Sequence, residues 1–139
     1  VQQAFQSMYQ SPTRSAHEWG ELVRNASPHR GPWPRVSVWH GNADKTVIPS
    51  NALEILKQWT EIHGLPLSPS VKTRVDGFPR EVWINGVGDE LIEAYTITNM
   101  AHGTPLAIGE AEGACGAPGP FLLPVGISSS FISTPSKCL

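Results

Sequence analysis

The chain has 139 residues, of which 40% are hydrophobic and 16% charged, with a formal net charge of −2 at pH 7. This length suffices for one domain with a buried core. The small negative charge, without any basic run, gives no electrostatic reason to expect binding to nucleic acid or an anionic membrane. No stretch of about 18 apolar residues occurs, so we expect no membrane-spanning helix.

Residues 1–34 are predicted to form a helical, lid-like segment that ends in a proline-rich connector. Ser15 and Glu18 have the spacing of a capping box at a helix start. Four apolar side chains then fall on one helical face: Trp19, Leu22, Val23 and Ala26. Residues 27–34 contain three prolines and a glycine, which exclude regular structure. Because the first residues lack both Met and an apolar signal region, we expect the chain to begin at a cut edge.

Residues 35–105 are predicted to form a strand, a helix, a hairpin and a further strand. Residues 35–40 end at Gly41, and their Val and Trp side chains suit a strand buried on both faces of a parallel sheet. A helix follows, with Asn51 as N-cap and Glu54 completing a second capping box. Its expected apolar stripe is formed by Leu53, Leu56, Trp59 and Ile62. Gly64 then ends the helix.

Three further strands are expected at residues 71–76, 81–85 and 91–97, separated by turns at 77–79 and 86–89. Residues 106–139 form a Gly-, Pro- and Ser-rich tail in which only 121–125 are markedly apolar. The fold class is therefore α/β. We expect part of an open sheet, with one well-defined helix and a β-hairpin, that is incomplete as a free-standing domain.

Asp44 and His102 each follow a predicted strand, in the turns GNAD and MAHGTP. Turns at the carboxyl ends of strands are where open α/β sheets usually carry their chemistry. An Asp in a turn is more commonly a turn-former, and a His beside Gly is more commonly plain loop. Their occurrence on successive strand ends favours an acid–base pair, in which the acid orients the His so that it can deprotonate a nucleophile.

The remaining candidates carry less chemistry. We expect His40 to fix its turn by hydrogen bonding, and His63 to complement a helix C-terminus. Asp89 and Glu93 are rival acids whose positions suit them to solvent. No histidine pair has metal-ligand spacing, so no metal site is expected. Two cysteines, Cys115 and Cys138, leave open one disulfide or two separate thiols.

A resemblance to a known family rests on three stretches of the sequence. Residues 38–44 (VWHGNAD), followed by Val47, Pro49, Asn51 and residues 58–60 (QWT), resemble the acid-bearing segment of poly(3-hydroxybutyrate) depolymerase-family esterases, which are α/β-hydrolases. Residues 100–105 (MAHGTP) resemble the histidine turn of that family, and residues 119–121 and 125–129 are similar to its C-terminal region. The resemblance implies that Asp44 is the acid and His102 the base of a Ser-His-Asp triad. It also implies carboxylic ester or polyester hydrolysis, no cofactor, and secretion from the cell.

The nucleophile of such a triad is missing from this sequence. No Gly-x-Ser-x-Gly motif occurs, although the superfamily order of Ser, acid and His would place the serine upstream of Val1. We therefore interpret the chain as the C-terminal part of a hydrolase catalytic domain, inactive alone. Its expected partners are an ester substrate and either an N-terminal half of the same enzyme or a second copy of itself, because an incomplete sheet exposes strand edges.

Two alternative functions remain. Asp44, His102 and Ser128 follow the chain order of subtilisin-like proteases, but only 26 residues separate the last two and the serine lacks the expected motif. A non-catalytic binding fragment would instead use its five tryptophans as a sugar or polymer surface. Trp33, between two prolines, is the one expected to be most exposed, whereas Trp39 and Trp59 suit the core.

Overall fold

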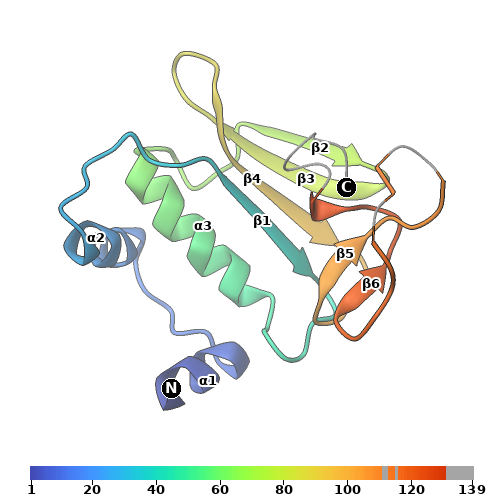
Figure 1. The fold of residues 1–139 in the computed structure, drawn as a ribbon. Coiled ribbons are helices and arrows are strands. Elements are labelled where there is room, and N and C mark those ends of the chain that lie inside the picture. The colour runs from blue at the N-terminus through green and yellow to red at the C-terminus, as the bar shows by residue number, and fades with distance from the viewer. Residues whose placement is uncertain (111–112, 115, 131–139) are drawn as a thin grey trace.

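The computed structural model describes residues 1–110, 113–114 and 116–130. Both cysteines lie outside these residues, as do all of residues 131–139. The described part contains a four-stranded sheet, a separate two-stranded sheet and three helices (Figure 1). The helices are α1 (Gln2–Tyr9), α2 (Ala16–Ala26) and α3 (Ser50–His63). The strands are β1 (Val36–Gly41), β2 (Val71–Val75), β3 (Phe78–Ile84), β4 (Glu90–Ile97), β5 (Thr104–Leu106) and β6 (Leu122–Pro124).

The main sheet has the strand order β1-β4-β3-β2 and confirms the α/β class. β1 and β4 are parallel neighbours, whereas β4, β3 and β2 pair antiparallel. The expected hairpin is present, but its turn consists of Asp76 and Gly77, whose φ angles are 48° and 83°. Positive φ at both central residues is what a type I′ two-residue hairpin loop requires. β3 therefore begins at Phe78, three residues earlier than the expected start at Glu81.

Each face of the main sheet has its own apolar cluster. On one face, α3 packs against β1, β3 and β4 through Val38, Leu56, Trp83 and Ile92 (Figure 1). The second cluster consists of Tyr95, Ile97, Met100 and Ile127, with Trp39 packed against it. The expectation that β1 is buried on both faces is wrong. Only Val38 and Gly41 of this strand are buried, and its pairing among the described residues is with β4 alone.

The start and the buried surface of α3 differ from the sequence prediction. The helix begins at Ser50 after Pro49, and no side chain caps it. Asn51 is inside the first turn, where its side-chain amide donates to the Ile48 carbonyl oxygen at 3.2 Å. Leu53 is 46% exposed, whereas Glu54 is buried. The helix is covered on two sides, by the sheet and by α2, so one apolar stripe does not describe its buried surface.

The contact between α2 and α3 explains why α3 buries a carboxylate. The Glu54 carboxylate accepts hydrogen bonds from the Trp19 indole nitrogen at 2.6 Å and the Lys57 ammonium at 2.7 Å. The Ser15–Glu18 capping box at the start of α2 is confirmed. The predicted apolar face is only partly correct, because Leu22 and Ala26 are exposed while α2 turns Trp19 and the buried Gly20 toward α3.

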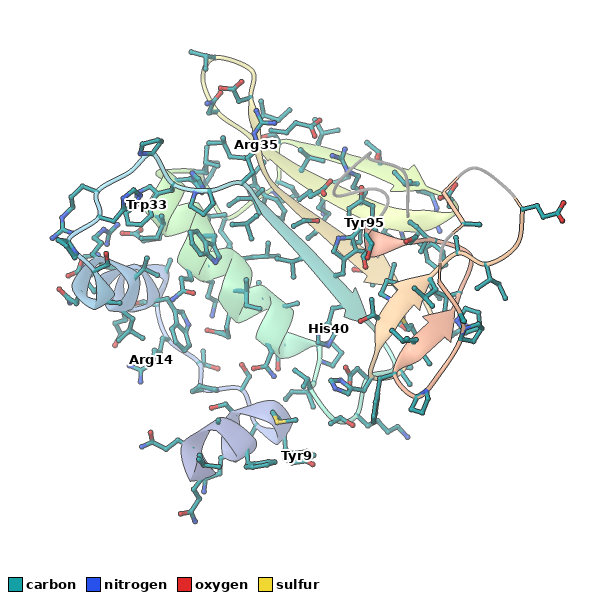
Figure 2. The ribbon with its side chains drawn as sticks, in the orientation of Figure 1. Tyr9, Arg14, Trp33, Arg35, His40 and Tyr95 are labelled. Carbon is teal, nitrogen blue, oxygen red and sulfur yellow. The ribbon has the colours of Figure 1, made fainter. Side chains whose placement is uncertain are left out.

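The segment after residue 105 contributes more structure than its composition suggested. β5 and β6 pair parallel at the end of the main sheet (Figure 1), and Leu106 and Ile127 are buried. Figure 2 shows His40 near the end of β1, close to where that strand leads toward α3. No helix in the described part of the chain has the length and apolar character needed to cross a membrane.

Candidate active site

Two turns meet at one edge of the main sheet. The acid turn follows β1 and carries Asp44, and the histidine turn follows β4 and carries His102. Because β1 and β4 are parallel neighbours, their carboxyl ends lie side by side. Three hydrogen bonds join the turns. The amide of Asn42 donates to the Ile97 carbonyl at 3.1 Å, and the amide of Ala43 to the Met100 carbonyl at 3.1 Å. The Asn99 amide donates to Asn42 Oδ1 at 2.7 Å.

Gly41 is the residue that lets these two turns approach so closely. A Cβ atom at this position would lie 2.1 Å from the Met100 carbonyl oxygen and 3.0 Å from that of Ala101. Both obstacles are backbone atoms, so no side-chain rotation could make room. The glycine at the end of β1 is therefore required for the contact between the turn that carries Asp44 and the turn that carries His102.

The Asp44 carboxylate is buried and fully oriented. Its exposure is 7%, and Oδ1 accepts hydrogen bonds from the amides of Thr46 at 2.8 Å and Val47 at 2.9 Å. Oδ2 lies 2.9 Å from His102 Nδ1. Burial raises the pKa of Asp44, but the hydrogen bond with His102 and the two amide hydrogen bonds outweigh it, and the pKa lies below its ordinary value. The group is therefore a carboxylate at neutral pH.

His102 is held at one nitrogen only. With Asp44 ionised, Nδ1 of a neutral imidazole carries the proton and donates it to Oδ2, which leaves the lone pair on Nε2. The side chain is 39% exposed, and Nε2 has no hydrogen bond to any described residue. This tautomer, with an available Nε2 lone pair, can accept a proton from an external hydroxyl.

His40 supports the acid turn from behind, in agreement with its expected hydrogen-bonding role. Its Nε2 lies 2.8 Å from the Val47 carbonyl oxygen and therefore acts as the donor. The same nitrogen is 3.9 Å from Asp44 Oδ2. The Val47 carbonyl oxygen thus accepts a hydrogen bond from His40, and the Val47 amide N–H donates one to Asp44. His63 also lies where predicted, in the last turn of α3, with Nε2 3.0 Å from the Pro34 carbonyl oxygen.

The other sequence candidates lie away from this pair or are otherwise engaged. Ser128 is only 2% exposed. Glu93 was expected to face solvent, which is wrong: its side chain is 17% exposed and accepts hydrogen bonds from Arg80 at 2.8 Å and Ser37 at 2.7 Å. Trp33 is partly buried against His29, with ring centroids 4.9 Å apart. No group of metal-ligating side chains occurs within the residues the structure describes.

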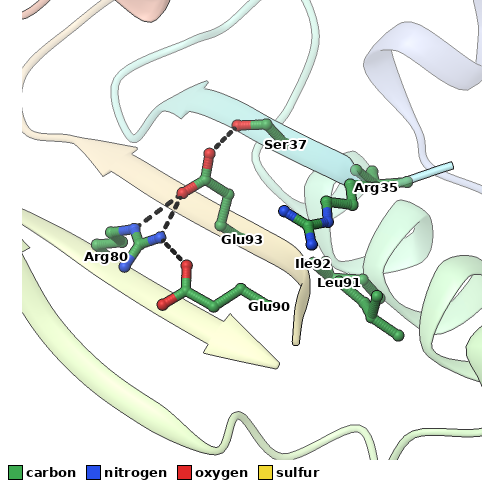
Figure 3. Close-up of a pocket in the computed structure, with 8 residues that line it drawn as sticks. Arg35, Ser37, Arg80, Glu90, Leu91, Ile92 and Glu93 are labelled. Atoms are coloured by element: carbon green, nitrogen blue, oxygen red, sulfur yellow. Dashed lines mark hydrogen bonds and ion pairs between the residues drawn. The ribbon is translucent and has the colours of Figure 1, made fainter. Parts of the chain in front are cut away.

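The main sheet also has a pocket of about 350 Å³ beside Arg80, Glu90 and Glu93 (Figure 3). Its lining includes Arg35 and Ser37 at the start of β1, whereas Asp44 follows the other end of that strand. Arg80 within it is paired with Glu90 at 2.6 Å and with Glu93 at 2.8 Å. These charges satisfy one another, and the pocket lies at the amino ends of the parallel strands. The open imidazole at the carboxyl ends is the better site for chemistry.

Three features of the site have little or no signal in the sequence. Gly41 lets the two turns approach each other, and Asn42 joins them through the hydrogen bond from the Asn99 amide. Both contacts depend on which strands pair, and no local sequence pattern reveals that pairing. The aromatic neighbour of His102 is Phe121, whose ring centroid is 5.8 Å from that of the imidazole. The apolar character of residues 121–125 was the only signal that this segment had a structural partner.

Comparison with known proteins gives a consistent set of relatives. The chain is 40% identical over 129 residues to poly(3-hydroxyalkanoate) depolymerase C of Paucimonas lemoignei, in an alignment that covers 92% of this chain and 31% of the depolymerase. It is 38% identical over 96 residues to an acetylxylan esterase of Coprinopsis cinerea, covering 66% of this chain and 25% of the esterase. A feruloyl esterase B of Neurospora crassa is 36% identical over 92 residues, with 63% and 30% covered. No family model matches the sequence.

A solved structure has a similar fold. The acetyl xylan esterase from Aspergillus awamori superposes with a TM-score of 0.61 at 22% identity, covering 70% of this chain and 35% of that one. These comparisons confirm the resemblance to poly(3-hydroxybutyrate) depolymerase-family esterases. The chain spans only 31% and 25% of the first two relatives.

Proposed function

We propose that this chain is the acid- and base-bearing part of a carboxylic ester hydrolase that works by a Ser-His-Asp mechanism. The observation that carries the proposal is the 2.9 Å contact between Asp44 Oδ2 and His102 Nδ1, at neighbouring carboxyl ends of a parallel strand pair. The relatives named as a polyester depolymerase, an acetylxylan esterase and a feruloyl esterase support esters as the substrate class.

In the proposed reaction, a serine outside this sequence attacks the ester carbonyl. His102 Nε2 accepts the serine proton and afterwards transfers it to the departing alkoxide, which leaves as an alcohol. Asp44 holds the imidazole in the tautomer with a proton on Nδ1 and stabilises the imidazolium that forms. Water then attacks the acyl-serine ester, again with His102 as base, and releases the carboxylic acid.

Because Asp44 and His102 lie in this chain and the serine lies outside it, the 139-residue chain would be inactive by itself. We propose that its sheet is the C-terminal portion of an α/β-hydrolase sheet, with residues 35–105 as its core, residues 1–34 as a lid-like segment and connector, and residues 106–139 as a tail. The serine would be supplied by an N-terminal part of the same enzyme, which would also cover the free edge of β1. Action on a polyester, as the name of the depolymerase suggests, belongs to the same proposal, and so does secretion, which the family resemblance implies.

The alternatives account for fewer of the observations. A subtilisin-like role would need Ser128 as an accessible nucleophile, but this side chain is 2% exposed. A tryptophan-lined binding surface would need exposed indoles. Trp83 is buried, and Trp39 stacks on Tyr95 with ring centroids 3.8 Å apart. Neither alternative uses the Asp44–His102 pair as it is arranged.

The test is a hydrolysis assay with p-nitrophenyl acetate, using the 139-residue chain alone and a Ser128→Ala variant. The proposal requires no hydrolysis above the background rate from either protein, and activity once the chain is joined to a serine-bearing N-terminal part. In the joined protein, His102→Ala should abolish this activity. Hydrolysis by the chain alone that disappears in Ser128→Ala would overturn the proposal, because it would place the nucleophile inside this sequence.

A further inference from the structure

Phe121 combines two features that are unfavourable by themselves. Its side chain is 65% exposed, so its apolar ring is left in contact with solvent. Its φ angle is 63°, in the left-handed region that bulky residues rarely occupy. Neither the exposed ring nor the positive φ angle stabilises the fold by itself. Backbone strain of this kind concentrates at functional sites.

The backbone of Phe121 is hydrogen-bonded directly to the segment that carries His102. The Phe121 carbonyl oxygen accepts a hydrogen bond from the Thr104 amide at 2.7 Å. A Cβ atom at Gly103 would lie 2.8 Å from that same oxygen, so the absence of a side chain at residue 103 allows the contact. This hydrogen bond therefore fixes the position of Phe121 relative to His102.

The ring itself lies against the imidazole of His102. The ring centroids are 5.8 Å apart with an interplanar angle of 70°, an edge-type arrangement. His102 is committed to Asp44 through Nδ1, while its other nitrogen has no hydrogen bond to a described residue. An exposed aromatic surface consequently stands beside the imidazole that would meet a substrate.

We propose that Phe121 is a substrate-contacting, specificity-determining residue whose ring packs against the alcohol portion of the ester. The inference rests on the proposed function and extends it. In that mechanism the leaving oxygen must lie within hydrogen-bond reach of His102 Nε2, about 2.6–3.2 Å, to receive its proton. The group attached to that oxygen is then the part of the substrate nearest to the Phe121 ring. An apolar or aromatic alcohol portion would cover the ring and gain an aromatic contact.

The experiment has a binding arm that does not need catalysis. The 139-residue chain is titrated with benzyl acetate and with methyl acetate, while the imidazole signals of His102 are followed by NMR. Benzyl acetate is expected to shift these signals at lower concentration than methyl acetate. Phe121→Ala and Phe121→Gly should remove that preference, whereas the matched control Leu122→Ala, at an exposed neighbour, should keep it. Since glycine adopts positive φ without strain, Phe121→Gly removes the ring without penalising the fold.

The kinetic arm uses the protein joined to its serine-bearing part. Phe121→Ala should lower the ratio of kcat/KM for benzyl acetate over methyl acetate by about tenfold, as loss of an aromatic contact and its apolar burial predicts. The ratio for methyl butyrate over methyl acetate, which varies the acyl portion, should stay constant. A benzyl preference that survives both Phe121 variants, or a change confined to the acyl ratio, would overturn the inference. Binding that depends on Phe121 in a protein that hydrolyses no ester would instead refute the proposed function alone.

Discussion

Gly41→Ala offers the sharpest test of how the acid turn and the histidine turn are brought together. The new methyl group would lie 2.1 Å from the Met100 carbonyl oxygen, and real Cβ atoms essentially never approach closer than 3.0 Å. The two backbone segments must therefore separate by about 1 Å. Overpacking of this kind costs typically about 1–3 kcal/mol of stability. A misplacement of about 1 Å between catalytic groups can cost on the order of 10²-fold in rate.

The assay compares Gly41→Ala with Gly86→Ala, where an added Cβ meets nothing within 4 Å. Thermal unfolding of the 139-residue chain gives the change in stability, and the NMR signal of the His102 Nδ1 proton reports its hydrogen bond to Asp44. We expect Gly41→Ala to lower Tm and weaken that signal, and Gly86→Ala to change neither. In the protein joined to its serine-bearing part, kcat/KM should fall about 10²-fold for Gly41→Ala alone. If Gly41→Ala left both the His102 imidazole signal and kcat/KM unchanged, the claim that the two turns can meet only at a glycine would be refuted.

Further predictions concern the side chains around the pair. Asp44→Asn should lower kcat of the joined protein by roughly 10⁴-fold, measured with p-nitrophenyl acetate, because the amide favours the wrong tautomer of His102. Because folding lowers the pKa of Asp44, the ionised carboxylate stabilises the folded chain. This contribution should be complete above the ordinary pKa of 3.8 and should disappear as pH falls through the lower pKa of the folded state. The difference in Tm between wild type and Asp44→Asn should therefore shrink in acid. His40→Leu should lower kcat/KM about tenfold by releasing Val47, which corresponds to the loss of about one hydrogen bond, whereas His40→Gln can still donate and should retain most activity. Glu54→Leu should destabilise the chain by about 3 kcal/mol in a denaturant titration, because it strands buried donors, yet leave the His102 NMR signal unchanged.

The sequence predicted those elements whose signals are local. The Ser15–Glu18 capping box, β2 and the C-terminal extent of β4 follow from neighbouring residues, and the structure has them where expected. Where tertiary packing decides, the same rules failed. Asn51 and Glu54 have the spacing of a capping box, but Glu54 is drawn to the α2 indole nitrogen instead. Glu93 alternates like a solvent-facing residue, but Arg80 on the adjacent strand holds it.

The candidate site divides in the same way. Asp44 and His102 could be singled out because each follows a strand, and parallel neighbours bring such turns together. Their proximity, once β1 and β4 pair, is a consequence of topology. The support given by Gly41 and Phe121 could not be predicted, because it depends on the Met100 carbonyl oxygen and on the hydrogen bond between Thr104 and Phe121. A glycine and a phenylalanine carry no sign of those partners in the sequence.

The two halves of the pair are held with different degrees of freedom, and that difference bears on function. Asp44 uses one oxygen for the turn amides and the other for His102, so its orientation is fixed before a substrate arrives. His102 is held through Nδ1 alone, with 39% of its side chain exposed. A fixed acid and an accessible base are what proton transfer to and from an external hydroxyl requires. Asp89, with its side chain 52% exposed, has no such environment. Glu54 is as deeply buried as Asp44 and also accepts hydrogen bonds. The contact of Oδ2 with His102 Nδ1 therefore distinguishes Asp44 from the other acids.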